Sequence, residues 1–343
     1  MNLMETMTTF GHEKVLFVNN EKAGLKAIIA VHNTVLGPAI GGCRLWPYAS
    51  EEEALFDVMR LSRGMSHKNA AAGLKFGGGK SVIIADPSQK TEAMFEAFGE
   101  AVNSLGGCYI TAEDVNTDCD DAIVMTRKTK YVCGLPAVSG DPSPFTAIGV
   151  WQGIKATAKV ALGTDDLNGV TIAVQGLGKV GYDLCRHLHE SGAKLIIANR
   201  SNQAMAQKAA EEFGAKIVPT EQSYAQECDI FSPNAMGAIL NPNTIPQLKC
   251  KAVAGGANNQ ILDDASGIAL KQRGIFYAPD FVINGGGVIN AAAEVDGPYN
   301  KEAVLEKVDN IYNSIEHILS ESKKTGEPEG VIATRYAESL IYG

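Results

Sequence analysis

A glycine-rich turn at residues 176–181 has the spacing of a dinucleotide-binding loop. It follows the apolar stretch VTIAVQ and precedes a helical pattern. In this setting glycines permit a tight turn and close approach of backbone N–H groups to a pyrophosphate, and the N-terminus of the next helix favours its charge. The alternative is a glycine-rich turn that binds nothing. The context favours a dinucleotide, held by Gly176, Gly178, Lys179, Val180 and Gly181.

The residues after the next apolar stretch, KLIIA, bear on which dinucleotide binds. A Rossmann loop is followed, about 20 residues on, by an Asp or Glu that accepts hydrogen bonds from the ribose 2′-OH. This chain has Asn199 and Arg200 there. Because a guanidinium suits a 2′-phosphate, the sequence predicts NADP(H) rather than NAD(H). An exposed Arg200 that caps the next helix, with either cofactor accepted, is the alternative.

Two lysines and one carboxylate in the first part of the chain have the types needed for acid–base chemistry. Lys80 follows a triple glycine, predicted to be a loop, and opens an apolar strand, while Lys68 ends a helical pattern. Partial desolvation and a second ammonium both favour a neutral amine, the form that can accept a proton. Asp114 follows the strand pattern CYITA, at an end that can face a cleft. Taken singly, each is equally consistent with a solvated lysine or a turn carboxylate.

The elements that must position these residues alternate between strand and helix patterns. In the first part, strand patterns at 26–31, 81–84 and 108–111 surround helical patterns that begin after Ser50 and at 91. From residue 170, repeated βα patterns predict a parallel, doubly wound Rossmann-type sheet. A turn-rich stretch at 134–144 separates the two. We therefore expect an α/β protein of two domains: a substrate domain, 1–140, joined by a C-terminal helix at about 326–343, and a dinucleotide-binding domain, 141–325.

Apolar residues at helical spacing after Asn300 predict one long amphipathic helix; they are Val304, Val308, Ile311, Ile315 and Ile318. We expect a second subunit to cover part of it, which predicts a homo-oligomer.

Charge and composition exclude several classes of function. A formal charge of −9 over 343 residues argues against nucleic acid or an anionic membrane as a partner. No apolar run has the length of a membrane helix, and the first residues lack a signal-peptide pattern, so we expect a cytoplasmic protein. The seven cysteines include no C-x-x-C pair and the six histidines have no ligand spacing beside them, which indicates reduced thiols and no metal site.

Longer motifs connect these residues to a known family. They are LGPAIGGCR (36–44), SRGMSHKNAAAGLKFGGGKSVI (62–83), AEDVNT (112–117), SGDPSPFTA (139–147), VQGLGKVG (174–181), GGANNQ (255–260) and PDFVINGGGVIN (279–290). Together, and in this order, they resemble the Glu/Leu/Phe/Val amino-acid dehydrogenase family, closest to its leucine and phenylalanine branch.

The resemblance implies a reaction and assigns roles to the candidate residues. The reaction is the reversible NAD(P)-dependent oxidative deamination of an L-amino acid to a 2-oxo acid and ammonia. Lys80 would activate the attacking water and Asp114 would move protons to and from the amino nitrogen. Lys68 would hold the substrate carboxylate, helped by the backbone at Gly41 and Gly42. Two further residues would hold the nicotinamide, namely Asn258 and Asn259.

The same resemblance bears on the substrate side chain. Relatives that bind a γ-carboxylate have a lysine where this chain has Ile40, so an acidic side chain would lack its counter-charge. The remaining pocket wall would comprise Ala112, Val288 and Ala291. The small Ala291 leaves room, and leucine, methionine, phenylalanine or tryptophan all fit this description.

Several residues depart from the family pattern: Asn116 replaces a glycine, Gly256 an alanine, Asn234 a cysteine and Met236 a leucine. These departures, with Asn199 and Arg200, leave two alternatives open. One is a strictly NAD-dependent leucine-type dehydrogenase, and the other is a catalytically weak nucleotide-binding regulatory protein. A regulator has no need of Lys68, Lys80 and Asp114 together, which counts against the second.

Overall fold

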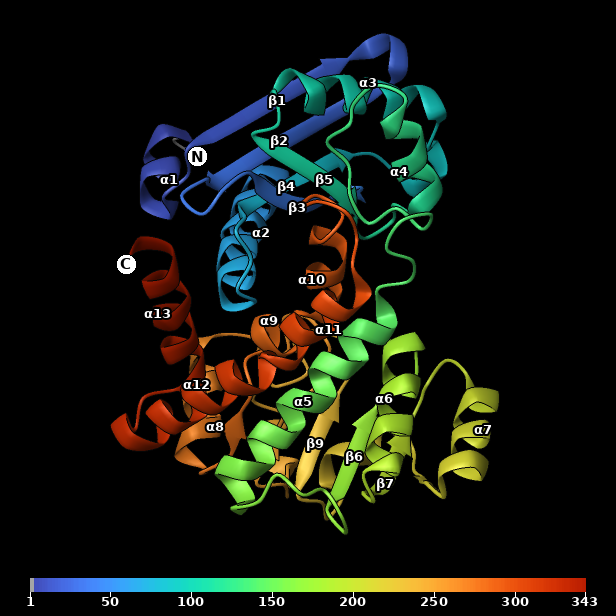
Figure 1. The fold of residues 1–343 in the computed structure, drawn as a ribbon, viewed down its shortest axis with the longest axis vertical. Coiled ribbons are helices and arrows are strands. Elements are labelled where there is room, and N and C mark those ends of the chain that lie inside the picture. The colour runs from blue at the N-terminus through green and yellow to red at the C-terminus, as the bar shows by residue number, and fades with distance from the viewer. Residues whose placement is uncertain (1–2) are drawn as a thin grey trace. The chain divides into compact units, whose positions relative to one another are not determined.

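The computed structural model describes residues 3–343, which form two compact α/β units (Figure 1). Unit 1 contains the chain up to Asp141 together with Val288–Asn300 and Ala337–Gly343, and unit 2 contains Pro142–Gly287 and Lys301–Tyr336. The two-domain α/β fold predicted from the sequence is confirmed. Unit 1 takes residues 288–300, which we had expected in the second domain, and the C-terminal helix is shared between the units.

Unit 1 is built on a mixed five-stranded sheet in the order β1-β2-β4-β3-β5. Strands β3, β4 and β5 are parallel, whereas β1 pairs antiparallel with β2 and β2 antiparallel with β4. The sequence patterns did not identify β1 or β3. The bounds are β1 Lys14–Asn20, β2 Leu25–Asn33, β3 Ala39–Trp46, β4 Gly77–Ile84 and β5 Tyr109–Glu113.

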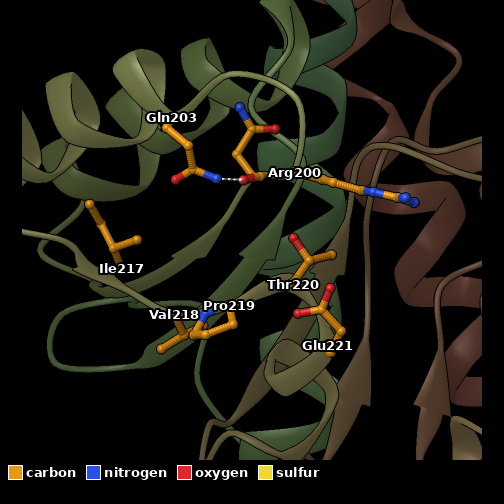
Figure 2. A pocket seen from close by; sticks show the side chains of 8 residues that line it. Arg200, Gln203, Ile217, Val218, Pro219, Thr220 and Glu221 are labelled. Carbon is orange, nitrogen blue, oxygen red and sulfur yellow. Dashed lines mark hydrogen bonds between the residues drawn. The ribbon is translucent and has the colours of Figure 1, made fainter.

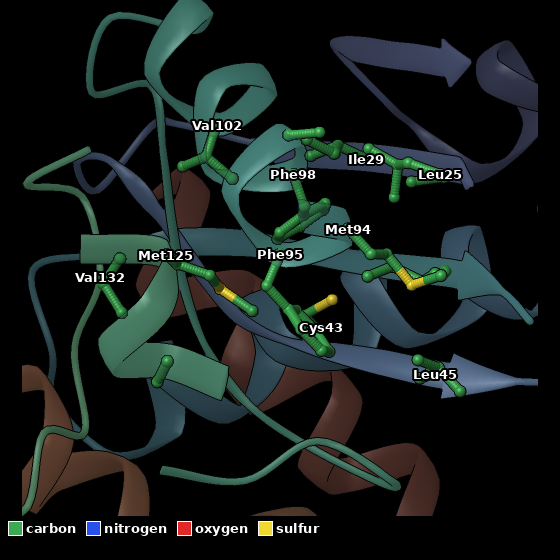
Figure 3. Close-up of a cluster of buried hydrophobic side chains, with 14 of the residues drawn as sticks. Leu25, Ile29, Cys43, Leu45, Met94, Phe95, Phe98, Val102, Met125 and Val132 are labelled. Carbon is green, nitrogen blue, oxygen red and sulfur yellow. The ribbon is translucent and has the colours of Figure 1, made fainter. Parts of the chain in front are cut away.

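Helices cover both faces of this sheet. Helix α2 (Glu51–Ala71), whose N-cap Ser50 accepts a hydrogen bond from the Glu53 backbone at 3.1 Å, packs Leu55, Val58 and Met59 on one face. On the other face α3 (Glu92–Ser104) and α4 (Cys119–Thr126) enclose an apolar core (Figure 3). The remaining short helices of this part of the chain are α1 (Leu3–Phe10), η1 (Glu21–Ala23) and η2 (Pro87–Gln89).

The triple glycine before Lys80 is not the loop that the sequence predicted. Gly77, Gly78 and Gly79 are buried residues of β4, so Lys80 lies within the strand rather than at its start. A Cβ on Gly78 would lie 2.1 Å from the backbone nitrogen of Ser66 in α2, and one on Gly79 would lie 2.6 Å from the Tyr109 ring. The glycines therefore let a helix and a neighbouring aromatic ring approach the sheet closely. In the sequence, glycines that serve this purpose look the same as glycines in a turn, which is why a loop was predicted.

Unit 2 is built on a six-stranded parallel sheet in the order β11-β10-β9-β6-β7-β8. Counted from β6, this is the strand order 3-2-1-4-5-6 of a Rossmann sheet. The doubly wound prediction is thereby confirmed. The bounds are β6 Thr171–Gln175, β7 Lys194–Ala198, β8 Lys216–Ile217, β9 Ile230–Pro233, β10 Ala252–Val253 and β11 Phe276–Tyr277.

The expected single long helix after Asn300 is two helices. α11 (Lys301–Asp309) and α12 (Ile311–Thr325) are separated at Asn310, and α12 packs against α5 (Ser143–Leu162) of the same unit. Their apolar residues are almost fully buried within this one chain, so this stripe gives no reason to expect a second subunit. The other helices are α6 (Lys179–Glu190), α7 (Gln203–Phe213), η3 (Thr220–Ala225), η4 (Ile245–Gln247), α8 (Asp264–Gln272), α9 (Asp280–Ile283), α10 (Gly286–Ala292) and α13 (Glu329–Tyr342).

Two properties of residues 3–343 bear on the excluded classes. None of the helices in this range is long and apolar enough to cross a membrane. Nowhere in the same range do three or more His, Cys, Asp or Glu side chains converge as metal ligands would.

Candidate active site

The two predicted acid–base residues of unit 1 form a direct ion pair. The Nζ atom of Lys80 lies 2.8 Å from Oδ1 of Asp114. Lys80 is 5% exposed and projects from β4, while Asp114 follows β5 at the end where its parallel neighbours also end. Side chains on a strand alternate between faces, and Lys80 shares a parity with Val82, which packs against α2. The pair therefore lies on the α2 side of the sheet.

Asp114 is an ionised carboxylate at neutral pH. Burial would raise the pKa of Asp114, but the Lys80 ammonium and the Arg44 guanidinium outweigh that effect and lower the pKa to about 2. Its second oxygen accepts a hydrogen bond from Nε of Arg44 at 3.0 Å. Such a carboxylate, desolvated yet charged, can accept a proton from a substrate group that displaces either cation.

Arg44 is a site residue to which the sequence interpretation assigned no role. It also donates to Asp57 from Nη1 at 2.9 Å, and the Tyr48 hydroxyl donates to the same Asp57 oxygen at 2.7 Å. The signal was present, because Arg44 follows Gly42 by two residues in β3 and so points to the same face of the sheet. Without knowledge that residues 39–46 are a strand, that spacing could not be used.

The turn after Asp114 is held to β3. The Asp114 backbone N–H donates to Oγ1 of Thr117 at 2.8 Å, and the same hydroxyl donates to the Cys43 carbonyl at 2.7 Å. Asn116, which stands where the family has glycine, has φ +59° and donates from Nδ2 to the Leu45 carbonyl at 3.0 Å. Asparagine tolerates this left-handed conformation better than most residues, so the departure preserves the turn.

Gly41 and Gly42 lie on β3 beside this pair. A Cβ on Gly42 would come within 2.9 Å of Asp114 Cβ, so any side chain there would displace the carboxylate. The Gly41 carbonyl accepts from the Tyr109 hydroxyl at 2.5 Å, a contact that fixes the strand's backbone. Lys68, the predicted carboxylate ligand, is half-buried in the last turn of α2, on the same side of the sheet.

All four residues predicted to line the side-chain pocket belong to unit 1. Ile40, 2% exposed, precedes Gly41 in β3. Ala112 and Ala291 both lie near Gly134, since a Cβ built on Gly134 would be 3.9 Å from the Cβ of each. Val288 is half-buried one turn before Ala291 in α10. Gly134 thus lies beside two of the predicted pocket residues; the sequence did not single it out, because it lay in the presumed domain boundary.

In unit 2 the glycine-rich turn connects β6 to α6 as predicted. Gly176 has φ +95°, and a Cβ there would lie 2.6 Å from that of Ala235. A Cβ on Gly181 would lie 2.0 Å from the Gly176 carbonyl oxygen, so this glycine permits helix–strand contact. Gly178 is the N-cap of α6, with no capping side chain and open space where its Cβ would be. Gly178 thus leaves open space at the N-terminus of α6, the place where a Rossmann fold binds a pyrophosphate.

The residues at the end of β7 border a pocket. Asn199 and Arg200 line it with Gln203 from α7 and residues 217–221, and in Figure 2 the Arg200 side chain extends away from Gln203 and Ile217. Asn199 also accepts a weak hydrogen bond from the Leu177 backbone at 3.4 Å, which ties the pocket to the glycine-rich turn. Glu221 lines the same pocket, so the pocket has one cationic and one acidic group.

The predicted nicotinamide residues follow β10. Asn258 and Asn259 are exposed, and Asn259 has φ +50°. Oδ1 of Asn258 accepts from Nδ2 of Asn284 at 2.7 Å, which fixes the orientation of the Asn258 amide. These exposed amides, together with the open glycine turn, fit a dinucleotide.

Two departures from the family pattern are structurally linked. Oδ1 of Asn234 accepts from the Gly256 backbone at 2.9 Å, and a Cβ on Gly256 would lie 2.9 Å from that oxygen. Asn234 in place of cysteine therefore suits glycine rather than alanine at 256. Met236, the third departure near this site, is 70% exposed.

A Rossmann sheet with this open glycine turn, in a chain whose other unit carries a buried lysine–carboxylate pair, defines a dinucleotide-dependent oxidoreductase. Comparison with known proteins specifies it further. Residues 12–131 match the family model "Glu/Leu/Phe/Val dehydrogenase, dimerisation domain", and residues 196–338 match "Glutamate/Leucine/Phenylalanine/Valine dehydrogenase". The chain belongs to this family and is an amino-acid dehydrogenase of the leucine, phenylalanine and tryptophan type, which catalyses oxidative deamination.

The relatives match the chain over nearly its whole length. Leucine dehydrogenase of Geobacillus stearothermophilus is 52% identical, over 99% of this chain and 94% of its own. Phenylalanine dehydrogenase of Bacillus thermotolerans is 46% identical, over 99% and 92%. The crystal structure of L-tryptophan dehydrogenase from Nostoc punctiforme superposes with a TM-score of 0.90 at 43% identity, covering 98% of each chain. The resemblance inferred from the motifs is confirmed.

Proposed function

We propose that this dehydrogenase acts on an apolar L-amino acid, leucine-like or aromatic, and yields the 2-oxo acid and ammonia reversibly, with NADP(H) as the favoured cofactor. The observation that carries the proposal is the buried Lys80–Asp114 pair, at 2.8 Å, beside Gly42. It places a carboxylate and a lysine amino group side by side, the two groups that exchange protons with the substrate and the attacking water in deamination.

Unit 1 binds the amino acid. Lys68 and the backbone at Gly41 and Gly42 hold its α-carboxylate, and Ile40, Ala112, Val288 and Ala291 surround its side chain. Ile40 is buried and offers no charge, so a glutamate side chain would lose its hydration without gaining a counter-charge at this position. Burying an unpaired ion in this way costs roughly several kcal/mol.

Asp114 and Lys80 divide the proton chemistry. The Asp114 carboxylate, whose pKa of about 2 keeps it charged, accepts a proton from the substrate ammonium and later returns one to the departing nitrogen. Lys80, as the neutral amine left after one proton has passed to solvent, accepts a proton from the water that attacks the imino carbon, and the ammonium so formed stabilises the negative charge that develops on the oxygen. A bound NAD(P)+ supplies the hydride acceptor.

Unit 2 binds the dinucleotide. Residues Gly176, Gly178, Lys179, Val180 and Gly181 hold the pyrophosphate, and Asn258 and Asn259 hold the nicotinamide. We assign the adenosine ribose to the pocket of Asn199 and Arg200, where the Arg200 guanidinium donates to a 2′-phosphate. NAD(H) is the second candidate, and the observation that favours it is Glu221 in the same pocket, because a carboxylate accepts from ribose hydroxyls and repels a phosphate.

We also propose that the protein is a homo-oligomer that acts in the cytoplasm. The first proposal is supported by the description of the matching N-terminal family model as a dimerisation domain. The second is supported by the seven free thiols, which suit a reducing compartment.

The decisive experiment measures initial rates of cofactor reduction with each of the twenty amino acids, once with NAD and once with NADP. We expect the highest kcat/KM with an apolar substrate and NADP. A preference for glutamate would contradict the substrate assignment, and a strong preference for NAD would contradict the cofactor assignment.

A further inference from the structure

A single carboxylate joins the end of α10 to the loop that follows Cys133. Oε2 of Glu294 accepts from the Gly134 backbone N–H at 2.9 Å, and Oε1 accepts from the Leu135 N–H at 2.9 Å. The Ser139 hydroxyl donates to the same Oε1. All of these residues belong to unit 1. Three donors on one side chain make Glu294 the main polar connection between the two segments.

A second polar connection runs parallel to the first. Nδ2 of Asn290, in α10, donates to the Ser139 carbonyl at 3.1 Å, and its Oδ1 accepts from the Tyr299 hydroxyl at 2.8 Å. The loop is therefore tied to α10 at both of its ends, at Gly134 and at Ser139. Upstream of Gly134 it is tied to β5, since the Cys133 N–H donates to the Thr111 carbonyl at 2.9 Å.

The position of Gly134 determines how far apart two pocket residues stand. A Cβ built on Gly134 would be 3.9 Å from the Cβ of Ala112 and 3.9 Å from that of Ala291, so Gly134 lies next to both residues. Its φ of +78° suits glycine. If the Glu294 bonds are lost, nothing else among the contacts described above holds the Gly134 N–H, and the space between Ala112 and Ala291 can widen.

We propose that Glu294 is a positioning residue for substrate specificity. It does not touch the substrate, but it fixes Gly134 and so sets the width of the pocket that receives the substrate side chain. The inference rests on the proposed function in one respect, namely that Ala112 and Ala291 line this pocket.

A carboxylate is suited to this task where an amide is not. It accepts hydrogen bonds at both oxygens, and bonds to a charged acceptor are stronger than neutral ones. Glutamine has the same shape but presents one oxygen and an NH2 group, which cannot accept from a backbone N–H. Glu294→Gln thus removes part of the connection with little change in volume.

The test compares kcat/KM for leucine and phenylalanine in wild type, Glu294→Gln and Ser139→Ala. We expect the phenylalanine-to-leucine ratio to rise about fivefold or more in Glu294→Gln and by a smaller factor in Ser139→Ala, because a wider pocket discriminates less against a larger side chain. Gly134→Ala should act oppositely and lower the ratio. A residue that only stabilises the fold would lower both rates together and leave the ratio unchanged.

Controls make each outcome decisive. Glu100→Gln removes an exposed carboxylate of α3 in the same unit and should leave the ratio at the wild-type value. If Glu294→Gln does not fold, the substrate ratios of Ser139→Ala and Gly134→Ala test the inference instead. Ratios within twofold of wild type in all soluble variants would overturn the inference. Should the wild type prefer glutamate, the proposed function fails, but the ratio over the substrates that it does accept still tests Glu294.

Discussion

The ammonium of Lys80 lies 2.8 Å from Oδ1 of Asp114, and the pair closes a chain of alternating charges that continues through Arg44 to Asp57. In the resting protein Asp114 is compensated by two cations, so a substrate ammonium that enters next to it finds a charged acceptor already oriented. A carboxylate that is already ionised and oriented can accept a proton directly, whereas a protonated carboxyl group would first have to lose its own proton.

Loss of either member of the pair should abolish most of the turnover. Lys80→Ala and Asp114→Asn should each lower kcat by roughly 10²–10⁴, because acid–base groups act in the transition state, while the Kd for the dinucleotide changes little. Steady-state kinetics and cofactor binding titrations measure the two quantities. Lys75→Ala, at an exposed lysine near Lys80, and Glu113→Gln serve as controls. Turnover near the wild-type value in either site variant would refute the assigned roles.

Arg44 should set the acid limit of activity. It is one of the two cations that lower the pKa of Asp114 to about 2, so Arg44→Met should raise that pKa by about 1–3 units. Asp114 acts as a carboxylate, hence activity is lost as pH falls through its pKa, and the acid limb of the kcat/KM profile should move to higher pH. Arg60→Met is the matched control, because Arg60 pairs with Asp57 but not with Asp114. An acid limb that is the same in both variants would argue that Arg44 does not influence Asp114.

The sequence predicted unit 2 more fully than unit 1, for a physical reason. In unit 2 the central strands β6 and β7 are short apolar runs, and each is followed by a helix, α6 or α7, so the local patterns and the topology agree. In unit 1 the site depends on strands whose sequences are locally ambiguous. β3 contains two adjacent glycines and β4 contains three. The sequence alone does not distinguish a glycine in a strand from a glycine in a turn.

Candidate site residues were predictable where a motif carried them and not where only tertiary contact did. The resemblance assigns roles to Lys80 and Asp114 from their motifs, but it assigns none to Arg44, the last residue of the motif at 36–44, or to Glu294. The contacts of these two residues depend on packing: Arg44 reaches Asp114 across 70 sequence positions, and Glu294 reaches Gly134 across 160. No local periodicity encodes such separations. Asn116 is an intermediate case, because its departure from glycine was visible in the sequence but its left-handed backbone was not.

Arg200 should govern cofactor choice. If it contacts a 2′-phosphate, Arg200→Ala removes one charge-assisted interaction of roughly 1.5–3 kcal/mol and should raise the KM for NADP about ten- to a hundredfold, with little effect on NAD. Asn199→Asp should favour NAD, because a carboxylate accepts from ribose hydroxyls and repels a phosphate.

Glu221→Gln separates the two cofactor assignments. If the Glu221 carboxylate repels the 2′-phosphate, the KM for NADP should be lower in Glu221→Gln than in the wild type. If it accepts hydrogen bonds from the ribose hydroxyls, the KM for NAD should be higher in this variant. Gln226→Glu, outside the lining of the pocket, is the control for the negative charge that Asn199→Asp adds. If the wild type strongly prefers NAD and Arg200→Ala alters neither KM, Arg200 is a solvated residue at the start of the helix and the NADP assignment is wrong.

A buried histidine cluster should make the fold sensitive to mild acid. His12, His32 and His67 are 8%, 3% and 9% exposed, and His12 and His32 have ring centroids 5.0 Å apart. His12 Nε2 meets the Ser62 hydroxyl at 2.7 Å, and His32 Nδ1 meets that of Ser66 at 2.7 Å. Nε2 of His67 lies 3.7 Å from Oε1 of Glu338. Burial, with smaller contributions from neighbouring imidazoles and from Arg63, lowers the pKa of each to about 4.

The sign of the effect follows from linkage. In the unfolded chain a histidine titrates near 6.5, so below that pH the unfolded state binds protons that the folded state excludes. Stability from this source is complete above pH 6.5 and is lost as pH falls toward 4, by about 2 kcal/mol per histidine at pH 5. Carboxylates with a lowered pKa, such as Asp114, lose their contribution to stability only below about pH 4. The pH range in which the histidines destabilise the fold is therefore separate from the range in which the carboxylates do.

Urea unfolding at pH 7.5 and at pH 5 measures this window. The wild type should lose several kcal/mol between the two, about the sum expected for two or three such groups, and His12→Gln should lose less, because one of the titrating groups is gone. His189→Gln, at an exposed histidine of α6, should show the wild-type dependence. Equal stability at the two pH values in the wild type would mean that the cluster accepts protons in the folded state, which contradicts the lowering of the three pKa values by burial.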